Sequence, residues 1–159
     1  MLVISDTSAI SNLIQIEQLG LLHLLYGQII IPKAVYDELC KIQSQKVLID
    51  DLNWIRIGVS QNISMIQELE NELDKGESES IALAIKLNAD FLIIDELKGR
   101  KIAENNGIKI VGLLGWLLKA KEKGYIQIVS TILEKLTNQA GFHISPQLKT
   151  YILKLANEL

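Results

Sequence analysis

The chain has 159 residues, of which 48% are hydrophobic and 22% charged, and its 19 acidic and 16 basic side chains give a formal net charge of −3. This length fits one domain with a sizeable core, and the negative balance excludes a protein that coats nucleic acid by bulk electrostatics. Only 5% of the residues are aromatic, which argues against base stacking on an aromatic platform as the main mode of binding.

The first third of the chain alternates short apolar runs with amphipathic stretches. In chain order it predicts strands at residues 2–5 and 28–31, and helices that begin near residues 9, 21 and 32. Asp6, Thr7 and Ser8 can cap the first of these helices, because their side chains accept hydrogen bonds from free backbone N–H groups. Pro32 suits the first turn of the third helix, where its missing N–H costs nothing.

The middle of the chain predicts a buried helix followed by the most strand-like run of the sequence. In order we expect a short helix, a strand or extended stretch, two helices and a strand, at residues 46–52, 54–59, 64–73, 77–87 and 91–94. A break at residues 74–76 separates the two longer helices. The helix at 77–87 is apolar nearly all round, so we expect it to be well buried.

The last third predicts one more strand and a set of closing helices. A helix at residues 98–105 ends at Asn106-Gly107, a good C-terminal signal, and a strand follows at 108–111. The remaining helices are expected at residues 113–123, 126–137 and 146–159.

Strands that alternate with helices predict a parallel sheet with right-handed crossovers. We therefore expect an α/β fold with three α/β/α layers around a sheet of four or five strands. The whole chain, residues 1–159, is predicted to form a single domain, with a core of about residues 1–115 and closing helices at about 113–159.

Two features bear on the compartment of the protein. Cys40 is the single cysteine, which excludes an internal disulfide and fits a reducing environment. The apolar start is too short for a signal peptide, and no apolar run approaches the roughly 20 residues that span a bilayer. We expect a cytoplasmic protein without membrane contact.

Four acidic residues follow predicted strands or lie on helices beside them: Asp6, Glu38, Glu79 and Asp95. Residues just past the ends of parallel strands collect in one crevice, where the strand order switches. Carboxylates gathered there repel one another and are costly to desolvate, so the cluster predicts a bound cation. Oxygen ligands without nearby His or Cys favour Mg²⁺ or Mn²⁺, which indicates metal-dependent phosphodiester chemistry.

The same residues carry a resemblance to the PIN-domain family, a group of small metal-dependent ribonucleases that includes the toxins of type II toxin–antitoxin pairs. The matching features are Asp6 with Thr7-Ser8 after the first strand, Glu38 within Val-Tyr-Asp-Glu-Leu, Glu79 opening the buried helix and Asp95 after Phe-Leu-Ile-Ile. Their order and spacing cover roughly residues 1–115. Further stretches at residues 76–84, 112–115 and 141–146 are similar to a prokaryotic PIN-like subgroup.

The chain departs from the family pattern at two positions. Many PIN toxins carry Thr or Ser two residues before the final Asp, where this chain has Ile93. Many also have Asp at the position of Glu79, so coordination distances and rates are expected to differ.

The resemblance and the residue types together imply a mechanism. Asp6, Glu79 and Asp95 are predicted to hold one or two divalent ions, and Glu38 to bind a metal or orient a water. A divalent ion lowers the pKa of the water that it holds and offsets charge on phosphate oxygens. The alternative is that these acids are solvated helix faces.

Glu77 competes with Glu79 for the third position. Two residues apart on a helix lie about 200° apart, so only one of them can face the crevice. We prefer Glu79, because it leads directly into the apolar run at residues 81–84, whereas Glu77 fits a first helical turn, where the dipole favours an acid.

Other side chains have possible supporting roles. Thr7 and Ser8 can hydrogen-bond a ligand or a substrate phosphate as well as cap a helix, and Glu96 is either an outer ligand or a solvated turn residue. Asp74 is assigned to the solvated surface. Three cations after Asp95 either contact RNA phosphates or form an exposed basic helix start: Lys98, Arg100 and Lys101.

The predicted function is a ribonuclease that uses Mg²⁺ or Mn²⁺, the toxin of a toxin–antitoxin pair. Apolar residues at 19–25, 113–118 and 126–136 exceed what one small domain needs, which favours a homodimer; the alternative is that they complete the chain's own core. The resemblance also implies an antitoxin segment across the active-site groove. One competing interpretation is a PIN-like scaffold that no longer cuts RNA. A phosphatase of the haloacid-dehalogenase type is disfavoured, since Ser8 stands where the second Asp is needed.

Overall fold

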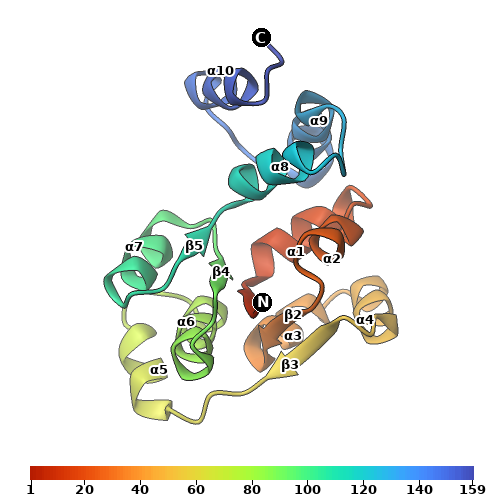
Figure 1. Ribbon diagram of the computed structural model, residues 1–159. Helices are drawn as coiled ribbons and strands as arrows, with labels where there is room; N and C mark the ends of the chain where they lie inside the picture. The colour runs from red at the N-terminus through yellow and green to blue at the C-terminus, as the bar shows by residue number, and fades with distance from the viewer.

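Five parallel strands form the central sheet in the order β3-β2-β1-β4-β5 (Figure 1). The computed structural model describes residues 1–159. The strands are β1 (Val3–Ser5), β2 (Ile29–Pro32), β3 (Ile55–Gly58), β4 (Phe91–Ile93) and β5 (Ile110–Val111). The predicted parallel sheet of four or five strands is therefore confirmed, and the uncertain stretch at 54–59 contains a strand.

Helices cover both faces of this sheet and give the three predicted layers. They are α1 (Thr7–Gln15), α2 (Gly20–Tyr26), α3 (Lys33–Leu39), α4 (Gln43–Asp51), α5 (Ile63–Leu69), α6 (Lys75–Leu87), α7 (Leu97–Asn105), α8 (Leu113–Glu122), α9 (Val129–Ala140) and α10 (Pro146–Leu155). None of them combines the length and apolar character that crossing a membrane requires.

Alternation along the strands divides the core between the two faces. Successive residues of a strand point to opposite sides, so Val3 and Ile93 join a large cluster with α1, α2, α8 and α9. Ile4 and Leu92 join a smaller cluster with α6 and α7. The central strands β1, β2 and β4 are covered on both faces and have no exposed residue. The edge strand β3 differs, because its Arg56 and Ile57 are exposed.

The boundaries of two helices differ from the prediction for identifiable reasons. Pro32 ends β2 and precedes α3 in an extended conformation, with ψ at 161°, instead of lying in the first turn. Helix α6 begins at Lys75, within the expected break, because Asp74 and Glu77 form a reciprocal capping box. The prediction that this helix is buried holds, and its buried Ser80 donates to the Gly76 carbonyl at 2.7 Å.

Most of the apolar side chains that favoured a dimer lie inside the chain's own core. The buried ones include Leu19, Leu21, Leu22, Leu25, Leu113, Trp116, Leu117, Ile132, Leu133 and Leu136. Leu24 and Ile128 remain more than half exposed. The apolar excess at residues 19–25 and in the closing helices is therefore largely used in completing the monomer.

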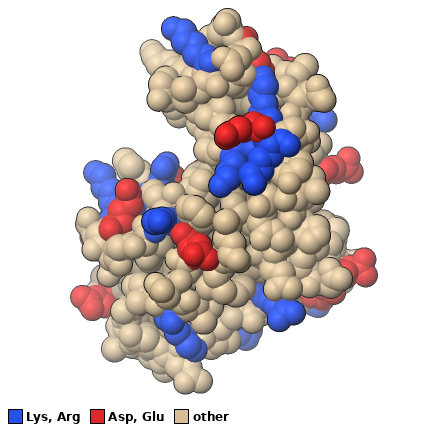
Figure 2. Space-filling model, in the orientation of Figure 1, with Lys and Arg blue, Asp and Glu red and all other residues tan.

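Positive side chains are unevenly distributed over the surface. Figure 2 shows Lys and Arg gathered over α8, whose last turn carries Lys119 and Lys121. The Lys119 ammonium nitrogen lies 5.7 Å from the centre of the Phe91 ring. Since Phe91 begins β4, this basic group lies toward the strand starts, away from the edge that carries Asp6 and Asp95.

One half-buried ion pair anchors the end of the chain. The Glu158 carboxylate accepts hydrogen bonds from the Lys121 ammonium group at 2.7 Å and from the Val129 and Ser130 N–H groups at 2.7 and 3.0 Å. Burial acts to raise its pKa, but these donors outweigh burial and lower it to about 2. The long-range cap explains why α9 begins at Val129, three residues later than its local sequence suggests.

We expect Glu158→Gln to lower the free energy of unfolding by about 1–2 kcal/mol at pH 7, the usual value of a helix cap with a charged partner. A depressed carboxyl pKa stabilises the folded state above the unfolded-state value of 4.5 and loses that effect as pH falls toward 2. Urea denaturation at pH 7 and pH 3 should therefore show a smaller difference from wild type at the lower pH. Glu122→Gln, at an exposed position of α8, is the control; an equal loss there would contradict the assigned role.

Candidate functional site

The strand order places two acidic residues at one edge of the sheet. β1 lies between β2 and β4, so the connections that leave β1 and β4 run in opposite directions, which is the switch point of an open α/β sheet. Asp6 directly follows β1, and Asp95 follows β4 after one residue. The Asp6 N–H donates to the Ile93 carbonyl at 3.1 Å, so the start of α1 is tied to the end of β4.

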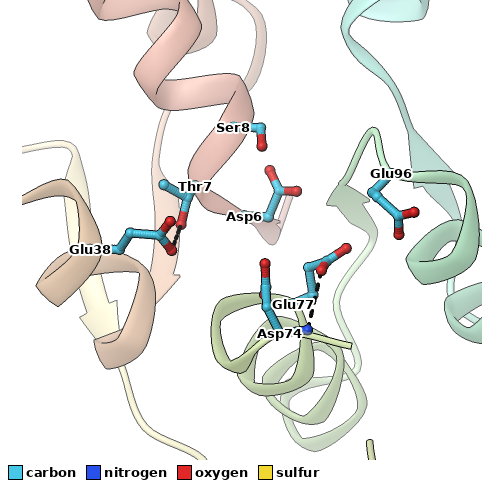
Figure 3. Close-up of a pocket in the computed structure, with 7 residues that line it drawn as sticks. All are labelled: Asp6, Thr7, Ser8, Glu38, Asp74, Glu77 and Glu96. Atoms are coloured by element: carbon cyan, nitrogen blue, oxygen red, sulfur yellow. Dashed lines mark hydrogen bonds between the residues drawn. The ribbon is translucent and has the colours of Figure 1, made fainter. Parts of the chain in front are cut away.

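A small acidic cavity of about 100 Å³ opens at this edge, and none of its seven lining residues is hydrophobic (Figure 3). They are Asp6, Thr7, Ser8, Glu38, Asp74, Glu77 and Glu96. Three of them are the residues that precede helices: Asp6 before α1, Asp74 before α6 and Glu96 before α7. The partial positive charge of these helix N-termini offsets part of the negative charge of the cavity.

Hydrogen bonds fix several of the lining side chains. The Thr7 hydroxyl donates to Glu38 Oε2 at 3.0 Å. The Glu77 N–H donates to Asp74 Oδ1 at 2.8 Å, and Glu96 Oε2 accepts from the Gly99 N–H at 3.2 Å. In Figure 3 the carboxyl groups of Asp6, Glu77 and Glu96 face the same space.

Three buried carboxylate oxygens have no hydrogen-bond partner: Asp6 Oδ1, Glu77 Oε2 and Asp95 Oδ2. The Asp6 side chain is only 3% exposed. A buried acceptor without a partner is costly, and a charged one more so. Their placement in one region indicates that these oxygens accept something other than a protein donor.

The pKa values of these acids reflect burial and mutual repulsion. Burial raises the pKa of Asp6 from 3.8 to about 8, with a further contribution from the charge of Asp95. Burial, together with the charge of Asp74, raises the pKa of Glu77 to about 7. Burial also raises the pKa of Asp95.

Asp95 is held from the opposite side of the site. Its Oδ1 accepts from the Leu113 N–H at the start of α8 at 2.8 Å, and this bond and the nearby Arg100 charge both act to lower its pKa. Asp95 borders a second cavity, of about 520 Å³, that reaches toward the C-terminal segment.

The preference for Glu79 over Glu77 does not agree with the geometry. Glu77 lines the acidic cavity, whereas Glu79 lines a separate cavity among α3, α5 and α6. Its Oε1 accepts from the Ala34 N–H at 3.1 Å, so it caps the start of α3. The physical reason is the packing of α6 beside α3: the bond to the Ala34 N–H holds Glu79 on the α3 side, and Glu77, about 200° away around the helix, therefore faces Asp6.

Other predicted residues are placed as follows. Thr7, Ser8 and Glu96 lie in the cavity with Asp6 and Glu38. Of the three predicted phosphate contacts, Lys98 and Lys101 are exposed and line neither cavity, while Arg100 is half-buried and borders the same cavity as Asp95.

Asp74 is a cavity residue that the sequence interpretation placed on the solvated surface. Its spacing from Glu77 is the D-x-x-E pattern of a capping box, which marks a helix start and could have placed it beside Glu77.

The chemistry of the site is that of oxygen ligands alone. No group of three or more His, Cys, Asp or Glu side chains is arranged so that it could hold a metal ion as the side chains stand. The unpartnered oxygens therefore belong to separate carboxylates near the switch point and do not form a closed coordination shell.

Comparison with protein families gives one match. The family model described as PIN domain matches residues 2–158. No curated protein matches the chain in a sequence search.

Proposed function

Since the chain belongs to the PIN-domain family, whose members are generally nucleases that bind divalent metals, we propose that it is a metal-dependent ribonuclease that hydrolyses RNA phosphodiester bonds. The observation that carries the proposal is the set of unpartnered buried oxygens on Asp6, Glu77 and Asp95 at the switch point of the sheet.

These residues fit Mg²⁺ or Mn²⁺. Both ions prefer carboxylate oxygens, and Mg²⁺ usually keeps several of its waters and is bound through only one or two carboxylates. A hydrated ion of this kind does not need three preformed ligands, so Asp6 and Asp95, with Glu77 beside them, would hold it. The raised pKa values agree with this assignment, because a cation is what would keep these acids ionised near neutral pH.

When bound, a divalent ion supplies an activated water and offsets negative charge on the phosphate. The side chains of the chain position the reactants. The Thr7 hydroxyl donates a hydrogen bond to Glu38 Oε2 and leaves Glu38 Oε1 without a protein donor. Glu38 Oε1 can therefore accept a proton from a water. The N-termini of α1 and α7 favour the phosphate through their backbone N–H groups.

We expect purified protein to cleave structured RNA with Mn²⁺ or Mg²⁺, and to lose that activity in EDTA and regain it when Mn²⁺ is added in excess. Protons compete with the metal for Asp6 and Glu77, whose pKa values are about 8 and about 7. The Mn²⁺ concentration for half-maximal cleavage should therefore fall as pH rises from 6 to 8, by about tenfold or more. Cleavage that persists in EDTA, or no cleavage at any metal concentration, would contradict the proposal.

We further propose that the chain is the toxin of a toxin–antitoxin pair. The family resemblance supports this role, and so does the acidic cavity, whose charge would attract a basic side chain of an antitoxin. Co-expression with the product of the neighbouring gene tests for a stable complex that suppresses cleavage.

Light scattering at micromolar concentration tests the proposed homodimer. A chain that binds such a partner and cuts no RNA would instead be a PIN-like scaffold.

A further inference from the structure

The cavity on the other side of Asp95 has no role in the proposed hydrolysis. Its volume of about 520 Å³ lies within the roughly 300–1,000 Å³ of ligand pockets. Six of its eleven lining residues are hydrophobic. Its walls come from β5, from the first turn of α8 and from the C-terminal segment, and include Gly115, Phe142, Leu148 and Ile152.

Arg100 gives this cavity a positive charge next to the acidic site. It is the only Lys or Arg among the residues that line either cavity. Gly112 leaves room for both Arg100 and Asp95, because a Cβ at Gly112 would lie 3.4 Å from Arg100 Nη1 and 3.1 Å from Asp95 Oδ1. The lysines over α8 lie toward the opposite end of the strands, so they do not provide this charge.

The lining therefore combines the guanidinium group of Arg100 with the flat ring of Phe142 and a wall of aliphatic side chains. Arginine binds phosphate and stacks on aromatic faces. A single aromatic side chain can stack one base, which is a smaller requirement than the aromatic platform that the composition argues against. His143, also in the lining, carries two ring nitrogens that can hydrogen-bond the edge of a base.

We propose that this cavity binds the nucleoside adjacent to the reacting phosphate, with its base against Phe142 and its phosphate toward Arg100. The proposal rests on RNA hydrolysis at Asp6 and Asp95. Asp95 borders this cavity and its chain neighbour Glu96 lines the acidic one, so a nucleotide seated beside Asp95 continues directly into the second cavity. An apolar side chain of a protein partner would use the aliphatic wall but would make no contact with the charge of Arg100.

Gly115 provides a way to fill the cavity without disturbing the fold. It lies exposed in the first turn of α8, and a Cβ built there meets only Val111 Cγ2, at an ordinary contact distance of 3.5 Å. Replacing a helical glycine also favours the helix. Gly115→Leu is therefore expected to fold and to occupy the cavity, and Gly115→Ala is the matched control that leaves most of the space open.

The test is an NMR titration of the metal-free protein in EDTA with the 5′-monophosphates of adenosine, cytidine, guanosine and uridine. We expect at least one of them to shift the amide signals of Arg100, Gly112 and Phe142. Gly115→Leu should weaken that binding about tenfold or more, and Phe142→Leu about fivefold or more, the loss that removal of a stacking ring causes. Gly115→Ala should bind as wild type does.

Three results would overturn the proposal. The first is that no monophosphate binds to the wild-type protein, and the second is that Gly115→Leu binds as wild type does. The third is unchanged binding in Phe142→Leu, which would assign the cavity to an aliphatic ligand such as a peptide side chain. Because binding is measured without metal, a wild-type protein that binds nucleotide but cuts no RNA would count against the ribonuclease function alone.

Discussion

Replacing Asp6 by asparagine is expected to abolish metal-dependent RNA cleavage and to stabilise the metal-free protein at the same time. Asp6 is 3% exposed and has an unpartnered Oδ1, so its charge is useful only when a cation is present. Asparagine keeps the shape of the side chain and removes the charge. Loss of function with a gain in stability is typical of a residue that is retained for binding.

The gain in stability should depend on pH in a defined direction. Below pH 3.8 the Asp6 carboxyl group is protonated in both the folded and the unfolded state, so it does not lower the free energy of unfolding. Between 3.8 and about 8 the unfolded chain releases the proton first, so the wild-type protein loses stability as pH rises. At pH 7 this loss is at most about 4 kcal/mol, and Asp6→Asn should recover part of it.

Thermal melts of both proteins in EDTA between pH 5 and pH 8 measure this difference. The wild-type melting temperature should fall relative to that of Asp6→Asn across the range, and saturating Mn²⁺ should raise only the wild-type value substantially. Asp51→Asn, at an exposed position on α4, should leave both melting and cleavage unchanged. Wild-type cleavage by Asp6→Asn, free of contaminating nuclease, would defeat the proposed mechanism.

Glu77→Gln is expected to lower the cleavage rate by about 10- to 100-fold, the scale on which metal sites respond to loss of a supporting carboxylate. Glu77 lines the acidic cavity and has an unpartnered Oε2. Glu79→Gln should remain within about threefold of wild type, because a glutamine oxygen can still accept from the Ala34 N–H. The two variants change the same chemical group two residues apart on one helix.

Single-turnover cleavage at saturating RNA, together with a Mn²⁺ titration, separates the two outcomes. Glu77→Gln should also need more metal for half-maximal activity, while Glu79→Gln should not. Equal circular dichroism spectra would show that both variants are folded. If Glu79→Gln is the inactive variant, the ligand is Glu79, and α6 must rotate when metal and substrate bind.

Much of the fold could be predicted because it depends on local patterns. Runs such as Phe-Leu-Ile-Ile at residues 91–94 are apolar at every position, which is the pattern of a parallel strand covered on both faces. Asp6 and Asp95 were placed together for a related reason, since residues just past adjacent parallel strands must lie at one edge. These inferences need only periodicity and chain order.

Helix α6 illustrates what the local pattern left open. Which of Glu77 and Glu79 faces Asp6 depends on how α6 packs beside α3, where Glu79 Oε1 accepts from the Ala34 N–H. Since the two residues lie about 200° apart around the helix, that contact leaves Glu77 facing the acidic cavity. The contact joins residues far apart in the chain, and hydrophobic periodicity does not reveal it.

The sequence by itself therefore determined the parallel sheet, the buried character of α6 and the edge at which Asp6 and Asp95 meet, because hydrophobic periodicity and chain order depend on neighbouring residues. Only the tertiary structure decided that Glu77 lines the cavity, that the leucines of α2 belong to the chain's own core and that Phe142 lies in one cavity with Asp95. The physical reason is that these relations depend on long-range contacts, such as Glu158 capping α9 from the end of the chain, and such contacts leave no periodic trace in the sequence.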